Sequence, residues 1–77
     1  MKIHHRILNN LIKNNNGMKL ILRDDSSTLD IYISNNLVLT LKLENGDIES
    51  NSEFIYNSII NLENVNMYIP KIYIKED

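Results

Sequence analysis

Residues 18–43, MKLILRDDSSTLDIYISNNLVLTLKL, decide the fold. Apolar residues occupy every second position in three successive runs of this stretch, and a period of two is typical of strands with one buried face. Polar turn residues separate the runs, with DDSS at 24–27 after the first and Asn35-Asn36 after the second. The stretch therefore predicts three antiparallel strands joined by short turns.

The two faces of the predicted sheet differ in chemistry. One face is expected to be apolar and in need of cover, and its residues in the second and third runs are Leu29, Ile31, Ile33, Leu37, Leu39, Leu41 and Leu43. The other face is expected to show Thr28, Asp30, Tyr32, Val38, Thr40 and Lys42. This second face is partly apolar, as on a face that is half-covered or that binds a partner.

Two further strands are predicted downstream. Asn45-Gly46 is the strongest short hairpin signal in the chain, and it would create a short fourth strand at 47–49. The alternation of residues 67–75 predicts a last strand. Its phase shifts at Pro70-Lys71, and because proline lacks a donor for the strand ladder, we expect a bulge there at an edge of the sheet.

A helix is predicted on each side of these runs in the chain. Apolar residues recur with the helical period before the Asn-Gly stop at 14–17, and they are Ile3, Ile7, Leu8, Leu11 and Ile12. A second helix is expected to begin at Ser50, because Ser50 and Glu53 have the spacing of a capping box. Its predicted apolar face consists of Phe54, Ile55, Ile59 and Leu62.

The order of these elements defines the fold class as α+β, with the order α-β-β-β-(β)-α-β. The two apolar helix stripes can cover the apolar sheet face, so we expect two layers, with an antiparallel sheet of three to five strands and two helices. The chain has 77 residues, a mass of 9.0 kDa and 43% hydrophobic residues, which predicts a single small domain over 1–77. A core of this size contributes only about 3–5 kcal/mol of net stability.

Composition excludes several classes of protein. Without cysteine there is no disulfide framework, thiolate metal site or cysteine nucleophile, and a reducing cytosol is expected. No apolar run approaches the roughly 18 residues of a membrane span, and the first residues lack the pattern of a signal peptide. Asn and Ile number 13 each and Ala is absent, which indicates an AT-rich genome, such as that of a low-GC bacterium or its phages and plasmids.

The sequence contains no arrangement of residues typical of catalysis or of cofactor binding. His4 and His5 are adjacent on the predicted helix and point about 100° apart, so they do not converge on one metal ion. Asp24 and Asp25 stand on a turn, where carboxylates commonly bond to nearby backbone. The glycines, Gly17 and Gly46, both lie in turns rather than in a phosphate-binding loop. We therefore expect a non-enzymatic protein with no catalytic residues, no metal and no cofactor.

Charge is distributed unevenly along the chain. Residues 1–23 carry five cations and no acid, whereas residues 24–66 carry eight acids and a single cation, Lys42. An isoelectric point of about 5.6 and the lack of a recognition helix or aromatic platform disfavour direct binding of nucleic acid. In an up-and-down meander the first and third turns lie at the same end of the sheet. Their carboxylates are therefore expected to form one anionic rim.

This rim predicts a binding site for a protein. Carboxylates on a rigid hairpin can substitute for phosphates and bind Arg and Lys side chains. The simpler interpretation is that charged turns keep a small protein soluble. With two neighbours on the second strand included, the candidate partner-binding residues are Asp24, Asp25, Asp30, Tyr32, Glu44, Asp47 and Glu49.

The layout resembles the small type II-A anti-CRISPR proteins of phages and prophages in low-GC bacteria, which include DNA-mimicking inhibitors. The resemblance is architectural and covers most of the chain. It rests on an amphipathic helix, a strand ending in an acidic turn, a strand hairpin with acidic margins, a second helix and a late charged strand. The segments are HRILNNLIKNNN (5–16), MKLILRDDSS (18–27), TLDIYISNNLVLTLKLENGDIES (28–50), SEFIYNSIINL (52–62) and KIYIKED (71–77).

The resemblance implies a stoichiometric inhibitor that binds a CRISPR effector nuclease in the host bacterial cytosol. The basic channel and the PAM-reading arginines of such an effector otherwise engage DNA, so an acidic edge that mimics DNA could occupy them. The alternative is a small antitoxin-like or self-associating accessory protein. A homodimer formed through the exposed sheet face is left open, and no contact with a membrane is expected.

Overall fold

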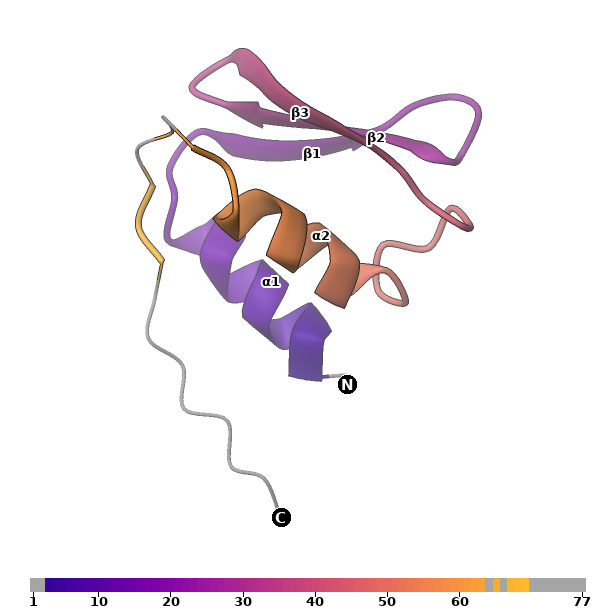
Figure 1. Ribbon diagram of the computed structural model, residues 1–77, viewed down its shortest axis with the longest axis horizontal. Helices are drawn as coiled ribbons and strands as arrows, with labels where there is room; N and C mark the ends of the chain where they lie inside the picture. The colour runs from indigo at the N-terminus through magenta and orange to yellow at the C-terminus, as the bar shows by residue number, and fades with distance from the viewer. Residues whose placement is uncertain (1–2, 64, 66, 70–77) are drawn as a thin grey trace.

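Three antiparallel strands form one layer of the protein and two helices form the other (Figure 1). This computed structural model describes residues 3–63, 65 and 67–69. The predicted α+β class is confirmed, with its helices and antiparallel strands in the order α-β-β-β-α. The elements are α1 (Ile3–Lys13), β1 (Met18–Leu22), β2 (Thr28–Ile33), β3 (Asn36–Lys42) and α2 (Ser52–Ile60).

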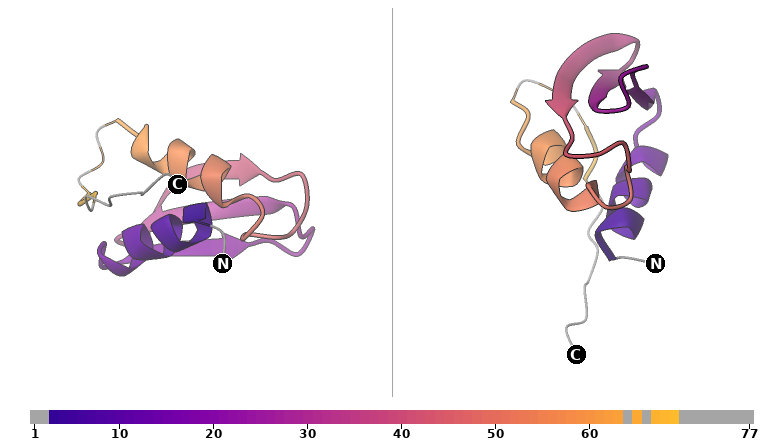
Figure 2. Two further views of the ribbon diagram at one scale, coloured as in Figure 1. Left: turned by 90° about the horizontal axis from the view of Figure 1, so that it is seen from below. Right: turned by 90° about the vertical axis from the view of Figure 1, so that its right-hand side faces the viewer.

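Both helices lie on the same side of the sheet, as Figure 2 shows. The predicted apolar stripe of α1 is confirmed at its centre, where Ile7, Leu8 and Leu11 are buried. The apolar side chains that are fully buried between the layers are Leu8, Leu11, Leu29, Ile31, Ile55 and Ile59. Neither helix covers the opposite face of the sheet, which we call the outer face. It carries Lys19, Ile21, Thr28, Asp30, Tyr32, Leu37, Thr40 and Lys42.

The turn between β2 and β3 lies one residue earlier than predicted. Its central residues are Ser34 and Asn35, with φ angles of 52° and 67°, rather than Asn35 and Asn36. Two successive left-handed residues give a hairpin turn whose twist matches that of the flanking strands. Asn36 is therefore the first residue of β3.

A β-bulge in β3 changes which side chains are buried. Ile31 pairs with Leu39, but the next residue, Tyr32, pairs with Leu37, so Val38 is the extra residue. Leu37 consequently lies on the outer face and is 52% exposed, while Val38 packs against the core. The faces predicted for Leu37 and Val38 were wrong, because an inserted residue breaks the strict alternation on which the prediction relied.

Residues 43–51 form a loop instead of the predicted hairpin and short fourth strand. The N–H of Asp47 donates to Asn45 Oδ1 at 3.0 Å, and the N–H of Glu49 donates to Asp47 Oδ1 at 3.1 Å. Short-range bonds of this kind compete with a strand ladder for the same backbone donors. The chain therefore turns directly from β3 towards α2.

Helix α2 begins at Ser52, whereas the capping-box spacing puts the N-cap at Ser50 and the first helical residue at 51. Its N-cap is Asn51, which makes no side-chain cap bond, while the hydroxyl of Ser50 donates to a backbone oxygen of the preceding loop. Phe54 was expected on the core face but is 48% exposed. Apolar residues nearly surround this helix, so their spacing alone does not define its buried side. The buried apolar residues of α2 are Ile55 and Ile59.

A hydrogen-bonded chain involving His5 and Ser52 joins the two helices. Asn9 Nδ2 donates to His5 Nε2 at 3.2 Å, and His5 Nδ1 lies 3.3 Å from Ser52 Oγ. Ser52, which is 1% exposed, in turn donates to the carbonyl oxygen of Ile48 at 2.9 Å. A buried hydroxyl needs such partners, so His5 has a structural role here.

After α2 the chain returns to the loop that precedes β1. Asn15 Nδ2 donates to the carbonyl oxygen of Tyr68 at 2.6 Å, and the N–H of Tyr68 donates to Asn15 Oδ1 at 2.7 Å. Met67 packs against the core. Residues 67–69 are not a strand. The rest of the predicted last strand, with its bulge at Pro70-Lys71, lies outside the described residues.

Candidate protein-binding site

Two loops meet at one end of the sheet, namely residues 23–27 between β1 and β2 and residues 43–51 after β3 (Figure 1). The N–H of Leu43 donates to the carbonyl oxygen of Ser27 at 2.7 Å. Gly46 lies so close to Ser26 that a Cβ atom on Gly46 would be 2.5 Å from the Ser26 carbonyl oxygen. The acidic turns predicted to lie at one end of the sheet are therefore in contact there, although the second is a loop and not a hairpin.

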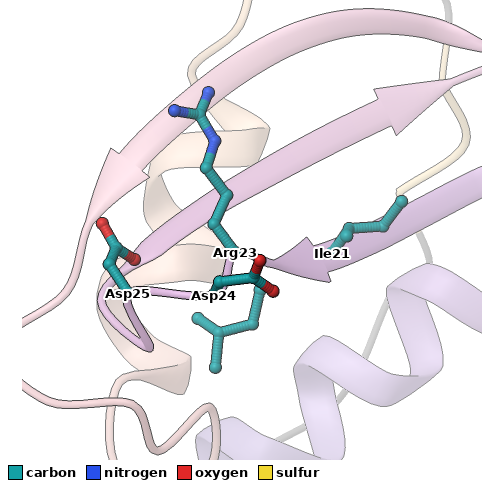
Figure 3. Close-up of a pocket in the computed structure, with 5 residues that line it drawn as sticks. Ile21, Arg23, Asp24 and Asp25 are labelled. Carbon is teal, nitrogen blue, oxygen red and sulfur yellow. The ribbon is translucent and has the colours of Figure 1, made fainter.

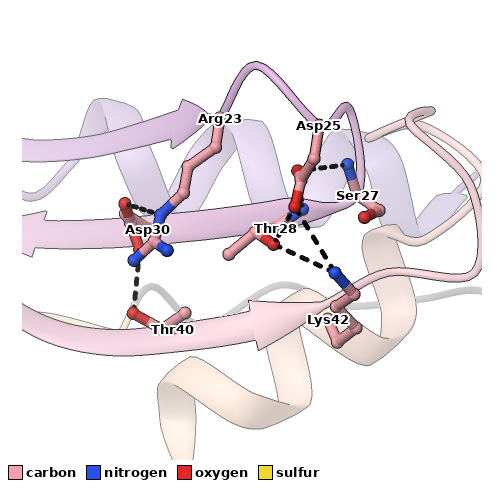
Figure 4. Close-up of polar contacts among 7 residues, drawn as sticks. All are labelled: Arg23, Asp25, Ser27, Thr28, Asp30, Thr40 and Lys42. Atoms are coloured by element: carbon pink, nitrogen blue, oxygen red, sulfur yellow. Dashed lines mark hydrogen bonds and ion pairs between the residues drawn. The ribbon is translucent and has the colours of Figure 1, made fainter.

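Asp25 is held by hydrogen bonds from its own loop, from the start of β2 and from the end of β3 (Figure 4). The N–H groups of Ser27 and Thr28 donate to Asp25 Oδ1, both at 2.9 Å, and Thr28 Oγ1 donates to Asp25 Oδ2 at 2.6 Å. Lys42 Nζ lies 3.4 Å from Asp25 Oδ2. These bonds, that of the Thr28 hydroxyl above all, hold the pKa of Asp25 well below its ordinary value. Both carboxylate oxygens are engaged, so Asp25 shapes the loop.

Asp30 lies on the outer face, where Arg23, the residue that follows β1, and Thr40 of β3 each supply a partner. Arg23 donates through Nε to Asp30 Oδ2 at 2.7 Å and through Nη2 to Asp30 Oδ1 at 2.9 Å. Thr40 Oγ1 donates to Asp30 Oδ1 at 2.8 Å (Figure 4). The bonds from Arg23 are the main cause of a lowered pKa of Asp30. Since Asp30 is only 7% exposed, its charge is used inside the protein.

Four carboxylates at this end of the sheet make no ion pair with any residue that the structure describes. All four side chains are exposed, and they are Asp24, Glu44, Asp47 and Glu49. We call these four residues the acidic end. Asp24 lies in the first of the two loops, and Glu44, Asp47 and Glu49 lie in the second. The contact between Gly46 and Ser26 joins the two loops. Exposed carboxylates without an ion-pair partner are suited to binding Lys and Arg side chains.

The structure therefore brings together only part of the predicted site. Asp25 lies beside the acidic end but is engaged in its own loop. Asp30 and Tyr32 lie apart from it on the outer face, and Tyr32 is half-buried between Lys19 and Leu37. Asp30 does not present a free carboxylate to a partner. Sequence reasoning missed both its ion pair with Arg23 and its hydrogen bond from Thr40, although strand pairing puts Thr40 directly opposite Asp30.

An open hollow of about 470 Å³ lies beside the end of β1 (Figure 3). Its lining residues are consecutive in the chain and are Ile21, Leu22, Arg23, Asp24 and Asp25. Figure 3 shows Arg23 extending away from the carboxylate of Asp24. Because one segment alone lines the hollow, it is bounded on one side only. It does not enclose a small molecule in the way that a ligand pocket does.

The described residues include no group of three or more His, Asp or Glu side chains that is placed to hold a metal ion. His4 lies 3.7 Å from Glu53, an ordinary contact between α1 and α2. Neither helix in this part of the chain has the length and apolar character needed to cross a membrane. Comparisons with protein-family models, with curated proteins and with solved structures gave no match.

Acidification is expected to destabilise the protein through Asp25 and Asp30. The pKa of each carboxyl group is lower in the folded chain than the value of about 3.9 in an unfolded chain. Their contribution to the free energy of unfolding is therefore fully present above about pH 5 and is lost progressively as pH falls through the unfolded-state pKa towards the lower folded-state values. Urea unfolding at a series of pH values measures this loss. Asp25→Asn should be less stable at neutral pH and less sensitive to acid. An acid response equal to that of the wild type would exclude Asp25 as a contributor.

Proposed function

We propose that this protein is a non-enzymatic binding protein whose acidic end engages a cationic surface of a partner protein. One observation supports this most strongly: four exposed carboxylates stand on two loops that are packed against each other. Asp24 belongs to the first loop and the other three carboxylates to the second. The contact between the loops holds the backbone segments that carry these charges next to each other before a partner arrives.

The second loop is also held from within. Asn51 Nδ2 donates to Asn45 Oδ1 at 3.0 Å and to the carbonyl oxygen of Asp47 at 2.7 Å, which ties the loop to the start of α2. A loop ordered in advance loses less conformational entropy when it binds. Carboxylates on such a support can occupy the positions that DNA phosphates take against Arg and Lys groups. Binding should also weaken as salt is added, since exposed charges are screened.

We propose a type II-A CRISPR effector nuclease as the partner, in the cytosol of a bacterial host. The acidic end and the resemblance of the layout to anti-CRISPR proteins support this choice. An effector of this kind has a positively charged channel and arginines that read the PAM. A protein that occupies these groups inhibits stoichiometrically, by keeping DNA out. An antitoxin-like accessory protein is the alternative, with a different cationic partner for the same acidic end.

Charge reversal at Glu44 and Glu49 tests the role of the acidic end. The side chains of both residues make no hydrogen bond within the described part of the chain, so the double variant Glu44→Lys/Glu49→Lys should fold normally. Its affinity for the purified, guide-loaded effector is expected to fall at least about tenfold, because two attractions become repulsions. Calorimetry measures this affinity, and a DNA-cleavage assay measures inhibition.

The matched control is Glu53→Lys/Glu63→Lys, which changes the net charge equally but lies on α2 and just after it. It is expected to bind and inhibit like the wild type. An equal loss in both double variants would show that net charge, and not the acidic end, governs binding. If the wild type fails to bind the effector at low salt, the nuclease is not the partner.

A further inference from the structure

The edge of β1 is unpaired along its length within the described residues. Among the described residues the strand order is β1-β2-β3, so β1 has one neighbouring strand there and its other edge has none. β1 is a regular five-residue strand with the sequence MKLIL, and its pairing with β2 shows no irregularity. It contains no proline and no bulge, which are devices that protect the edges of natural sheets from pairing with another chain.

The hydrogen bonds of β1 show which backbone groups face that edge. The N–H of Arg23 donates to the Thr28 oxygen at 2.8 Å, and the N–H of Ser34 donates to the Gly17 oxygen at 3.1 Å. Bonding in an antiparallel ladder alternates along each strand. Lys19 and Ile21 therefore also bond to β2, which leaves the N–H and C=O groups of Leu20 and Leu22 pointing to the free edge.

The edge of β3 differs from that of β1. The bulge at Val38 interrupts the regular spacing of its backbone groups. Bulges of this kind bend the strand, increase its twist and so discourage pairing at an edge. In the part of the sheet that the structure describes, the edge of β1 is thus the more regular row of backbone donors and acceptors.

We propose that the free edge of β1 pairs with β1 of a second copy of this chain, so that two three-stranded sheets join into one. The two backbones would run antiparallel about a two-fold axis at Ile21. Leu20 of each copy would then exchange two N–H···O=C hydrogen bonds with Leu22 of the other copy. The N–H and C=O groups that these two residues direct to the free edge would thereby all have partners. Ile21, which is 48% exposed, would face its symmetry mate across the axis on the outer face.

Charge complementarity favours this antiparallel arrangement over a parallel one. β1 has a cation, Lys19, near its beginning, and Asp24, whose carboxylate makes no ion pair among the described residues, lies two residues beyond its end, after Arg23. Antiparallel pairing brings the Lys19 end of each copy to the carboxylate end of the other. Arg23, which would lie opposite Lys19, already has its charge compensated by the two bonds to Asp30. The open hollow beside residues 21–25 leaves space for the second backbone.

A cysteine cross-link tests the predicted axis. The chain has no cysteine, so a single introduced thiol can pair only with its copy. Residues facing each other in a non-hydrogen-bonded antiparallel pair have Cα atoms about 4.5 Å apart, which suits a disulfide. Ile21→Cys is expected to form a covalent dimer in mild oxidant. Leu37→Cys, equally exposed on the same face but on β3, is expected to remain monomeric on a non-reducing gel.

Sedimentation then tests the interface without a cross-link. The wild type is expected to sediment with twice the 9.0 kDa mass of the chain. Leu37→Lys, which places the same charge on β3, is the control and is expected to sediment with the same mass as the wild type. Ile21→Lys should sediment as a monomer, because it sets two like charges opposite each other at the axis. Because Ile21 is exposed, the circular dichroism spectrum of Ile21→Lys should remain that of the folded protein.

Three results would overturn the proposal. The first is a wild type that remains monomeric at a protein concentration of about 1 mM. The Kd of the dimer would then exceed about 1 mM, which is too weak for a specific dimer. The second is equal disruption by Ile21→Lys and Leu37→Lys, which would indicate stacking of two outer faces. The third is a monomer whose Leu20 and Leu22 amides resist hydrogen exchange, since another segment of the same chain would then occupy the edge. None of these variants alters the acidic end, so failure here leaves the proposed function intact.

Discussion

Replacing Ile31 with alanine is expected to leave much of the chain unfolded at 25 °C. Ile31 is fully buried at the centre of β2, with Leu20 and Leu39 as its neighbours on the flanking strands. Truncating such a side chain costs about 2–5 kcal/mol, because apolar contacts are lost and a cavity remains. A core of this size supplies only about 3–5 kcal/mol of net stability. Circular dichroism during urea unfolding measures the change.

The matched control for this prediction is Leu37→Ala. Leu37 belongs to the same sheet but is 52% exposed, and surface truncations usually change the free energy of unfolding by less than about 0.5 kcal/mol. It should therefore unfold at nearly the wild-type urea concentration. Wild-type stability in Ile31→Ala would contradict the assignment of Ile31 to the core.

Alanine at Gly46 is expected to separate the two loops that carry the acidic end. Its Cβ would lie 2.5 Å from the carbonyl oxygen of Ser26, a backbone atom that cannot move without its loop. Overpacking of this kind costs about 1–3 kcal/mol. We expect a lower free energy of unfolding and, in addition, weaker binding of a cationic partner, because Asp24 would shift relative to Glu44 and Asp47.

Gly17→Ala provides the comparison for that variant. Gly17 has a φ of 89°, a conformation that disfavours any side chain, and it lies at the opposite end of the sheet beside Ser34. It should therefore be destabilised by about 1–2 kcal/mol with its binding unchanged. Equal loss of affinity in both glycine variants would mean that global stability, and not the geometry of the loops, controls binding.

The sequence patterns predicted the elements correctly where a single hydrophobic period covered a segment and no turn or capping signal competed with it. The period of two over residues 18–33 and the helical stripe of α1 are strong and unopposed, and both match the structure. The α+β class could be predicted from these elements, because one apolar sheet face and two apolar helix stripes can be buried against each other in few ways. Errors occurred where two local signals competed. Asn45-Gly46 favoured a hairpin, but the side chains of Asn45 and Asp47 bond to the loop backbone instead.

The site was predicted in position but not in detail. Connectivity alone places the first and third connections of a meander at one end, so Asp24 and Glu49 could be assigned to the same end from the sequence. Which carboxylates are free depends on contacts between strands. Asp30 forms an ion pair with Arg23 and accepts a hydrogen bond from Thr40, and Asp25 is bonded to Thr28 and Lys42. Such partners depend on register, and a single bulge is enough to change it.

The two hydrogen bonds between Asn15 and Tyr68 have a practical consequence for attaching the protein to a support. They anchor the chain after α2 at the beginning of β1, whereas Asp24 and Glu44 lie beyond the far ends of β1 and β3. A biotin or fluorophore coupled at Tyr68 would thus be separated from those carboxylates by the length of a strand. Sensor surfaces prepared in this way should leave the carboxylates facing the analyte.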